Sequence, residues 1–412
     1  MTELSLLIKR LKNGISKNSS YISSIKNPTL LIKSLEELDN VIGNKEVKDS
    51  VAIQVSHLIM IKKRSLEKKI IKEDNDVMLN TVLYGPPGVG KTIIGNKLAK
   101  IWYSLGFLKK VNKEINLNNI IDEYNQNQDL YLLIFYIVLM LISYLTGKAE
   151  TIYNNLKNYI FFLIIVIALI FSLYIILYKI NNKNNIIKDK ENINEDNIIK
   201  IVSRADFVDK YVGWSDKKTL KLLNDNLGKV LFVDEAYSLV TNMHDTFGLE
   251  VLTTINLFIS QHPNEIIIIF AGYKDLMEKT IFSFQPGLKR RFMWQFDCSG
   301  YNYKELFDIF KFQLNKKGWD IENSEEVKEL FNKNVDSFGS YGGDTERLAF
   351  FSELEHSKEF IDNEEGMVSN ILKTSHIQKG IKKLKENNIK SNNESITKNI
   401  PEDFLEKLTS LY

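Results

Sequence analysis

The stretch GPPGVGKT at residues 85–92 has the residue types and spacing of a loop that binds phosphate groups. Its glycines let backbone N–H groups turn inward, and the amphipathic helix that follows presents its positive end. Lys91 would reach the outer phosphates of a nucleotide, and Thr92 would offer a hydroxyl to magnesium. A chance glycine turn is the alternative, but it is rare between a strand and a helix. The residues assigned to nucleotide binding here are Gly85, Pro86, Pro87, Gly88, Val89, Gly90, Lys91 and Thr92.

A second motif, VLFVDEA at residues 230–236, places two carboxylates directly after four apolar residues. Such a run is typical of a parallel strand buried on both faces, and the carboxyl ends of these strands form the edge where open sheets bind ligands. We expect Asp234 to hold magnesium through water and Glu235 to polarise the attacking water. A plain strand cap is the alternative. Paired with the phosphate loop, the motif predicts Mg-dependent hydrolysis of ATP.

Arginine is rare in a chain that prefers lysine. It occurs only at Arg10, Arg64, Arg204, Arg290, Arg291 and Arg347. Arg290 and Arg291 adjoin each other after QPG, where planar and permanently charged guanidinium groups suit phosphate better than lysine does. Either arginine fits this role, and a solvated turn is the alternative.

The order and spacing of these and other motifs resemble the AAA+ ATPases, and within them the CbbX/CfxQ group related to SpoVK. The resemblance covers most of residues 36–356 and is carried by LIKSLEELDNVIGNKEVKDSV, GPPGVGKT, DFVDKYVGWSDKKT, VLFVDEAYSL, IIFAGYKDLM and QPGLKRRF. It implies an α/β fold in which a parallel P-loop sheet carries helices on both faces and is followed by an all-helical C-terminal lid. It also implies ATP and Mg as cofactors and assembly into a ring, a homo-hexamer.

The resemblance assigns further residues to the nucleotide. Val41, Ile42 and Gly43 are expected to lie against the adenine, and Tyr273 or Lys274 to occupy the sensor one neighbourhood. Together with Lys91 and Glu235 as catalytic residues, these positions complete the site expected within one subunit.

Two arginines correspond to functional positions of the family, and only the first of them lies in a segment that follows the family pattern. Arg291 matches the arginine finger that reaches the γ-phosphate of a neighbouring subunit, with Arg290 as the alternative. In the lid the chain departs from the family pattern, because Glu346 and Arg347 stand where a sensor two arginine is expected. Arg347 is carried over to that role, with an ordinary surface contact as the alternative.

The residues Tyr211, Val212 and Gly213 match the pore loop with which such rings grip a polypeptide. The alternative is a buried tyrosine beside a turn. The position of these residues, before the helical stretch TLKLL, favours the pore loop.

Two apolar runs, at about 130–146 and 159–179, interrupt the ATPase motifs. The second has about the length that spans a bilayer, and neither shows the polar stripe of a helix that meets water. We therefore expect an inserted two-helix transmembrane hairpin, with a buried core helix as the alternative. Lysines flank the hairpin and are scarce in its loop, so the positive-inside tendency predicts an integral membrane protein whose ATPase domain faces the cytosol.

The motifs predict four regions along the chain. Residues 1–34 form a helical lead-in, residues 35–108 and 198–300 form the AAA+ domain, residues 109–197 form the insertion, and residues 301–412 form the lid and tail.

Composition narrows the partners. The formal net charge is +2 with 26% charged residues, so no basic excess indicates a nucleic-acid partner. The single cysteine, Cys298, permits no internal disulfide, and we expect it to be a core thiol. The stretch MTELSLLIKRLKNG lacks the apolar core of a secretory signal.

Taken together, these features predict a membrane-anchored AAA+ ATPase that couples Mg-ATP hydrolysis to remodelling or threading of a protein client through a ring. One alternative is an ATP-switched membrane scaffold that threads nothing. Another is a clamp or helicase loader, which the low net charge disfavours.

Overall fold

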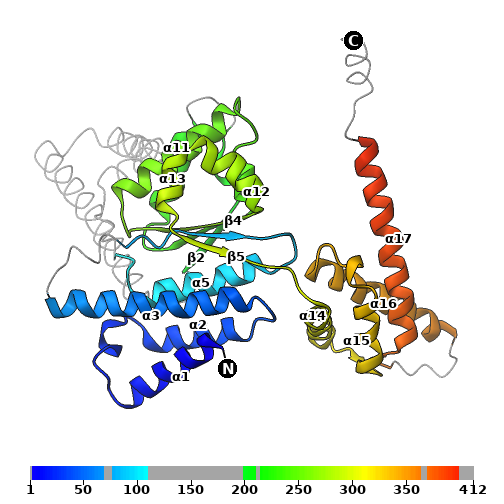
Figure 1. Ribbon diagram of the computed structural model, residues 1–412. Coiled ribbons are helices and arrows are strands. Elements are labelled where there is room, and N and C mark those ends of the chain that lie inside the picture. The colour runs from blue at the N-terminus through cyan, green and yellow to red at the C-terminus, as the bar shows by residue number, and fades with distance from the viewer. Residues whose placement is uncertain (1, 69–76, 110–197, 210–213, 363–368, 399–412) are drawn as a thin grey trace, which may run out of the picture. The chain divides into compact units, whose positions relative to one another are not determined.

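A five-stranded parallel sheet forms the centre of the computed structural model (Figure 1). The model describes residues 2–68, 77–109, 198–209, 214–362 and 369–398. The strands are β1 (Thr81–Tyr84), β2 (Ile199–Val202), β3 (Val230–Val233), β4 (Ile267–Gly272) and β5 (Trp294–Asp297). Their order is β2-β3-β4-β1-β5, and all neighbours run parallel. The strand order therefore reverses beside β1, which is where open α/β sheets bind ligands between their carboxyl ends.

The sheet is buried on both faces, which explains the uninterrupted apolar runs in its sequence. Along β4, Ile267 and Ile269 enter one core, whereas Ile268 and Phe270 enter the other. Helix α5 (Lys91–Leu105) covers the first face, with α2 (Pro28–Asp39) packed on α5, and α11 (Thr246–Gln261) and α13 (Pro286–Arg291) cover the second (Figure 1). The expected parallel α/β fold with helices on both faces is confirmed.

Short elements connect the strands. They are α9 (Arg204–Phe207), α10 (Ser215–Asp225), η4 (Ala236–Leu239), α12 (Lys274–Met277) and η5 (Glu278–Phe282). Two of them, α9 and η4, directly follow β2 and β3 on the ligand-binding edge of the sheet. They therefore position the chain segments that follow these two strands.

The N-terminal helices belong to the same core as the sheet. They are α1 (Glu3–Ser16), the short η1 (Ile22–Ser24), α2 and α3 (Lys45–Lys68). Leu4 and Leu11 of α1 are buried in the core that also contains Ile269. Helix α2 begins with Pro28 after an Asn27 cap, so the boundary expected between residues 34 and 35 falls inside a helix.

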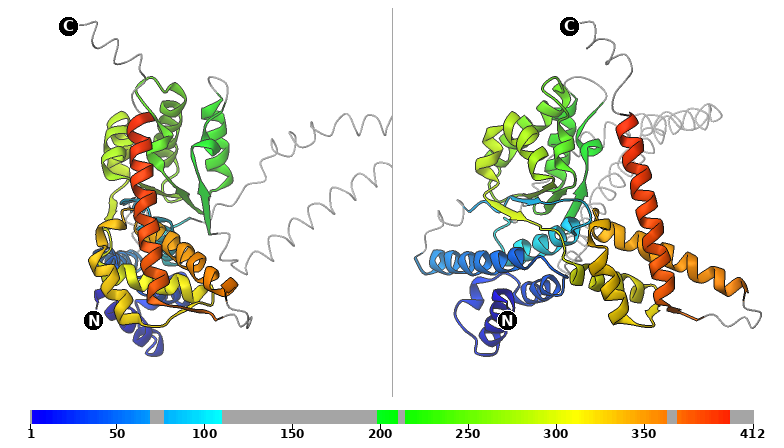
Figure 2. Two further views of the ribbon diagram at one scale, coloured as in Figure 1. Left: turned by 90° about the vertical axis from the view of Figure 1, so that its right-hand side faces the viewer. Right: turned by 45° about the vertical axis from the view of Figure 1, so that its right-hand side comes forward.

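The C-terminal region is helical, as expected. It comprises α14 (Tyr303–Lys316), α15 (Ser324–Lys333), η6 (Val335–Ser337), α16 (Gly342–Asp362) and α17 (Thr374–Lys398), with a small parallel pair of β6 (Asp320–Ile321) and β7 (Ile371–Leu372). Figure 2 shows α16 and α17 side by side. Lys383 of α17 pairs with the buried Glu355 of α16 at 2.5 Å, so charge as well as packing joins the two helices.

The prediction of an integral membrane protein with a cytosolic ATPase domain is contradicted. In the part of the chain that the structure describes, no helix combines the length and apolar character that crossing a bilayer requires. The long helices α3, α16 and α17 carry charged side chains along their length, and such groups are costly in lipid. The apolar runs at 130–146 and 159–179 lie outside the described residues.

Candidate nucleotide site

The phosphate loop leaves the sheet between β1 and α5, at the reversal of strand order. The N–H of Gly85 donates to the carbonyl of Gly272 at the end of β4, at 3.1 Å. A Cβ atom at Gly85 would lie 2.6 Å from the carbonyl oxygen of Cys298, and one at Gly88 only 1.9 Å from that of Ser340. Gly88 also has a φ of 75°. These two positions therefore require glycine for close approach of the backbone.

Lys91 is the first residue of α5, and its amine lies within the loop. Its Nζ donates to the carbonyls of Gly85 and Pro86 at 2.9 and 2.8 Å. Burial lowers the pKa of the Lys91 amine from its ordinary value. The amine also lies 5.6 Å from the centre of the Tyr273 ring. The structure thus brings two of the residues expected at the phosphates, Lys91 and Tyr273, close together.

Thr92 and Asp234 meet although they come from different elements. The Thr92 hydroxyl donates to the Asp234 carboxylate at 3.1 Å, and Asp234 directly follows β3. A hydroxyl and a carboxylate side by side match the oxygen ligands that Mg²⁺ prefers. The pair therefore fits the predicted magnesium site.

Glu235 has an unusual backbone conformation. Its φ of 47° and ψ of 45° lie in the left-handed region, which a residue other than glycine seldom adopts. Its N–H donates to Asp234 at 3.0 Å, and its side chain is exposed. The turn thereby leaves the Glu235 carboxylate free of the sheet and open to water, as a base that activates water requires.

Tyr237 was not singled out from the sequence, although it lies two residues after Glu235 in the same motif. Its ring centre is 5.5 Å from that of Tyr273. Burial and the nearby Glu235 carboxylate raise the pKa of Tyr237. Lys274, the alternative to Tyr273, instead pairs with Asp297 at 2.9 Å. Tyr273 is therefore the one of the two that lies beside Lys91.

The segment at residues 41–44, expected at the adenine, is fixed by side chains from outside it. The Lys48 amine donates to the Val41 carbonyl, and to that of Asp39 at 2.8 Å. Gly43 and Asn44 both have positive φ, at 70° and 51°. The Asn44 amide donates to the Tyr301 hydroxyl at 3.2 Å, and Tyr301 in turn contacts the phosphate loop. Ile42 and Gly43 are thus held next to the loop.

The arginines expected to sense phosphate contact their own or a neighbouring helix. Arg291 donates to the Gly287 carbonyl within α13 at 2.8 Å, and its buried Nε has no hydrogen-bond partner among the described residues. Arg347 donates to Asp344 at 3.1 Å and to Asn388 at 2.9 Å. Neither contact involves the phosphate loop. Arg290 is exposed, and the pore-loop residues Tyr211, Val212 and Gly213 lie outside the described residues.

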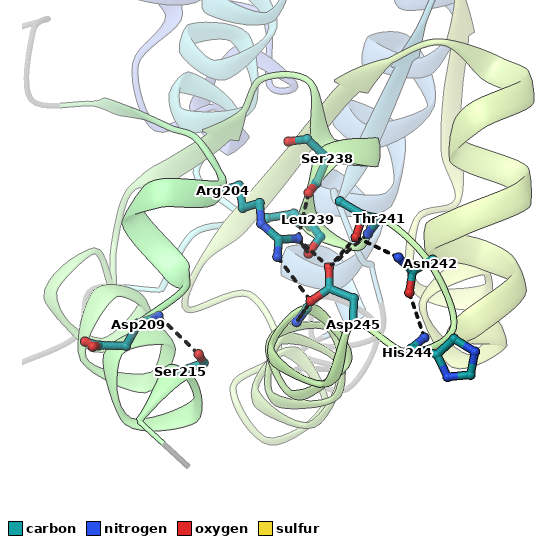
Figure 3. A network of polar contacts seen from close by, with 10 residues as sticks. Arg204, Asp209, Ser215, Ser238, Leu239, Thr241, Asn242, His244 and Asp245 are labelled. Atoms are coloured by element: carbon teal, nitrogen blue, oxygen red, sulfur yellow. Dashed lines mark hydrogen bonds and ion pairs between the residues drawn. The ribbon is translucent and has the colours of Figure 1, made fainter. Parts of the chain in front are cut away.

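A partly buried ion pair joins the segments that follow β2 and β3 (Figure 3). Arg204 of α9 donates to the carbonyls of Ser238 and Leu239 at 2.9 and 2.6 Å. Its guanidinium also meets both carboxylate oxygens of Asp245, at 2.7 and 3.1 Å. This bidentate geometry is the strong form of such a pair.

Asp245 also caps α11, since its carboxylate accepts a hydrogen bond from the N–H of Gly248 at 3.0 Å. The same carboxylate accepts from the N–H of Thr241, which precedes the helix, at 2.9 Å. Burial alone would raise the pKa of Asp245, but Arg204 and the two N–H groups outweigh it and hold the pKa well below its usual range. The network fixes the chain beyond Glu235. No local sequence pattern indicates this network, because Arg204 lies in α9, the two carbonyls in η4, and Asp245 at the start of α11.

Comparisons with known proteins show partial similarity to ATPase relatives. No protein-family model matches the chain. A CfxQ-like protein of Acanthamoeba polyphaga mimivirus is 24% identical over 88% of this chain and 67% of its own length. Stage V sporulation protein K of Bacillus subtilis is 34% identical over 30% of this chain and 38% of its own. The chloroplastic ribulose bisphosphate carboxylase/oxygenase activase of Cyanidioschyzon merolae is 34% identical over 27% of this chain and 36% of its own.

The matches to the last two proteins therefore span less than half of their length. Among solved structures, the AAA domain of FIGL-1 in complex with ADP aligns over 84% of this chain and 83% of that one, with 14% identity and a TM-score of 0.46.

The parallel sheet, the glycine-rich loop and the paired carboxylates define a P-loop ATP hydrolase of the AAA+ class. Within that class, the sequence similarities support a relationship to the CfxQ-like and SpoVK-like ATPases. The expected enzyme class is thus confirmed.

Proposed function

We propose that this ATPase uses Mg-ATP hydrolysis to remodel a protein client by threading it through a homo-hexameric ring. The single observation that carries the ATPase part is the 3.1 Å contact between Thr92 and Asp234, made at the sheet edge that also presents Lys91. The ring and the threading are supported by the family resemblance of Arg291 and of Tyr211.

The residues divide the chemistry among them. Lys91 binds the outer phosphates, and Thr92 and Asp234 hold magnesium, which neutralises charge on the phosphates. Glu235 orients the attacking water. Arg291 reaches the nucleotide of the neighbouring subunit, for which its guanidinium must leave the Gly287 carbonyl that it contacts at 2.8 Å.

The adenine and the sensors complete the proposed site. Ile42 and Gly43 lie against the adenine, and Tyr273 serves as sensor one beside Lys91. Arg347 serves as sensor two only after leaving Asp344, to which it is paired at 3.1 Å.

The names of the relatives support a protein client. One is an activase of the enzyme ribulose bisphosphate carboxylase/oxygenase, and another is the ESX-1 secretion system protein EccA1 of Mycolicibacterium smegmatis. The first name describes an activator of another protein, and the second a component of a secretion system. The low net charge of this chain argues against a nucleic acid as the client.

Hydrolysis is tested with two variants that separate binding from chemistry. Lys91→Ala should weaken MgATP binding by at least about tenfold, because it removes the cation that contacts the outer phosphates. Glu235→Gln should keep MgATP binding and lower kcat by about a hundredfold or more, because it removes the base. Equal turnover in wild type and Glu235→Gln would show that the assignment of Glu235 is wrong.

Client remodelling is tested by trapping. Glu235→Gln protein loaded with MgATP should retain a client, which is then added to wild-type protein to measure stimulated ATPase activity. Tyr211→Ala should keep basal activity and lose the stimulation, because the grip on the polypeptide is removed while the nucleotide site is unchanged. Stimulation that survives in Tyr211→Ala contradicts threading, and no stimulation of wild type favours an ATP-switched scaffold.

A further inference from the structure

Two consecutive carbonyls of the phosphate loop accept hydrogen bonds from the chain that follows the sheet. The Gly88 carbonyl accepts from the N–H of Gly342 at 3.1 Å. The Val89 carbonyl accepts from the Tyr301 hydroxyl at 2.8 Å. Gly342 begins α16, and Tyr301 lies between β5 and α14. The backbone of the loop is therefore held from the C-terminal side.

Tyr301 is fixed in its role as a donor. Its side chain is buried in the core, and its hydroxyl accepts a hydrogen bond from Asn44 at 3.2 Å while it donates to Val89. Its ring meets that of Tyr341 edge to face, with centres 6.0 Å apart. Burial raises the pKa of Tyr301 to about 12, so the hydroxyl keeps its proton at physiological pH.

Because of peptide geometry, these two hydrogen bonds also set the direction in which the N–H groups of the loop point. A trans peptide unit is planar, so the carbonyl of one residue and the N–H of the next point in opposite directions. Holding the carbonyls of Gly88 and Val89 toward the C-terminal region turns the N–H groups of Val89 and Gly90 the other way. Inward-pointing N–H groups of such a loop are what bind phosphate.

We propose that Tyr301 and Gly342 are positioning groups for phosphate binding. By holding the carbonyls of Val89 and Gly88, they keep the N–H groups of Gly90 and Val89 aimed at the nucleotide. This rests on the proposed nucleotide site and adds a dependence of that site on the C-terminal helices. Displacing α16 from the loop would remove one of the two orienting bonds and lower phosphate affinity.

The first test removes one hydroxyl. Tyr301→Phe deletes the closer donor to the Val89 carbonyl, leaving only the Asn44 amide at 3.5 Å, and keeps the ring that packs on Gly43 and Tyr341. Tyr303→Phe is the matched control, because the described residues give its hydroxyl no hydrogen bond. A neutral hydrogen bond of this kind corresponds to roughly a fivefold to tenfold effect. The KM for MgATP should rise by about that factor in Tyr301→Phe, with kcat almost unchanged, and stay at the wild-type value in Tyr303→Phe.

The second test displaces the other donor. A Cβ atom at Gly342 would lie 2.8 Å from the Gly88 carbonyl oxygen, so Gly342→Ala must open that contact. At Gly343 the nearest atom to a new Cβ is 3.8 Å away, an ordinary contact, and Gly343→Ala is the control in the same helix. The KM should rise in Gly342→Ala alone.

A spectroscopic measurement separates positioning from general loss of structure. With ¹⁵N-glycine labelling, the amide signal of Gly90 should move in Tyr301→Phe without nucleotide, while the melting temperature stays near that of wild type. The inference is overturned if folded Tyr301→Phe shows the wild-type KM and the wild-type Gly90 signal. If Gly342→Ala does not fold, the results for Tyr301→Phe decide the inference by themselves. If Lys91→Ala also binds MgATP normally, the loop is not the phosphate site and the proposed function fails as well.

Discussion

At the scale of single residues, the Thr92 hydroxyl and the Asp234 carboxylate meet across a sequence separation of 142 residues. Each side chain stands where a regular element begins or ends, Thr92 in the first turn of α5 and Asp234 just beyond β3. Their positions are set by hydrogen-bonded backbone rather than by a loose loop. A site built on rigid elements keeps its ligands in place before a nucleotide arrives.

Cys298 is predicted to be unreactive in the folded protein. Burial raises the pKa of its thiol to about 12, and only the thiolate reacts with alkylating reagents. Iodoacetamide at pH 8 should therefore modify native protein at least about a hundredfold more slowly than denatured protein. Mass spectrometry gives a direct reading, because Cys298 is the only cysteine. Equal rates in the two states would contradict the burial of this thiol.

Asp245 is predicted to stabilise the fold down to acidic pH. Asp245→Asn should lower the free energy of unfolding by about 1.5 to 3 kcal/mol, because Arg204 and two N–H groups bind the charged carboxylate. The folded pKa lies below the unfolded value of about 3.9, so the contribution is complete above that pH. The difference between wild type and variant should then stay constant from pH 7 to pH 5 and shrink only below about pH 4.

Denaturant titrations at several pH values measure this difference. Asp225→Asn, at an exposed position on α10, is the control and should change stability by less than about 0.5 kcal/mol. A difference for Asp245→Asn that disappears already between pH 7 and pH 5 would argue against the depressed pKa.

At the scale of elements, the closeness of α5 to the sheet depends on Gly95. A Cβ atom there would lie 2.2 Å from the ring of Phe232 in β3. Gly95→Ala should cost about 1 to 3 kcal/mol of stability despite the better helix propensity of alanine, because the core must be overpacked. The shift should also weaken MgATP binding, since α5 carries Lys91 and Thr92.

Chemical denaturation and nucleotide titration check this prediction together. Gly339→Ala is the control, because nothing lies within 4 Å of a Cβ at that position. If Gly95→Ala is as stable as Gly339→Ala, the close packing of α5 on β3 is not as described.

At the scale of the whole molecule, the proposed ring predicts that active sites are shared. Arg291→Ala and Glu235→Gln subunits should each be inactive alone, and mixing them should restore part of the ATPase activity. In a mixed ring, some interfaces join an intact Arg291 to an intact Glu235. ATPase assays over a series of mixing ratios measure the rescue. Mixed rings that form without any recovery would contradict a finger acting between subunits, and repeating the series with Arg290→Ala separates the two arginines.

The sequence by itself determined the parts of this protein that depend on local spacing. GPPGVGKT sets a strand, a turn and a helix within a few residues, and VLFVDEA sets a buried strand ending in carboxylates. Apolar runs without alternation identified parallel strands, because both faces of such strands are covered. From these features the α/β fold and the ATP hydrolase class could be predicted, whereas the residues assigned to the nucleotide stay a prediction.

Only the tertiary structure decided which distant residues support that site. No local sequence pattern indicates the supporting residues, because each contacts a segment that folding brings to it from elsewhere in the chain. These residues are Tyr301, Asn44, Arg204 and Asp245. The N-terminal helix α1 joins the main core for the same reason. The predicted membrane location relied on two apolar runs and on the lysines that flank them, and the described helices do not support it. The spacing of residues along the chain determines local structure, whereas contacts between distant residues depend on how whole helices and strands pack.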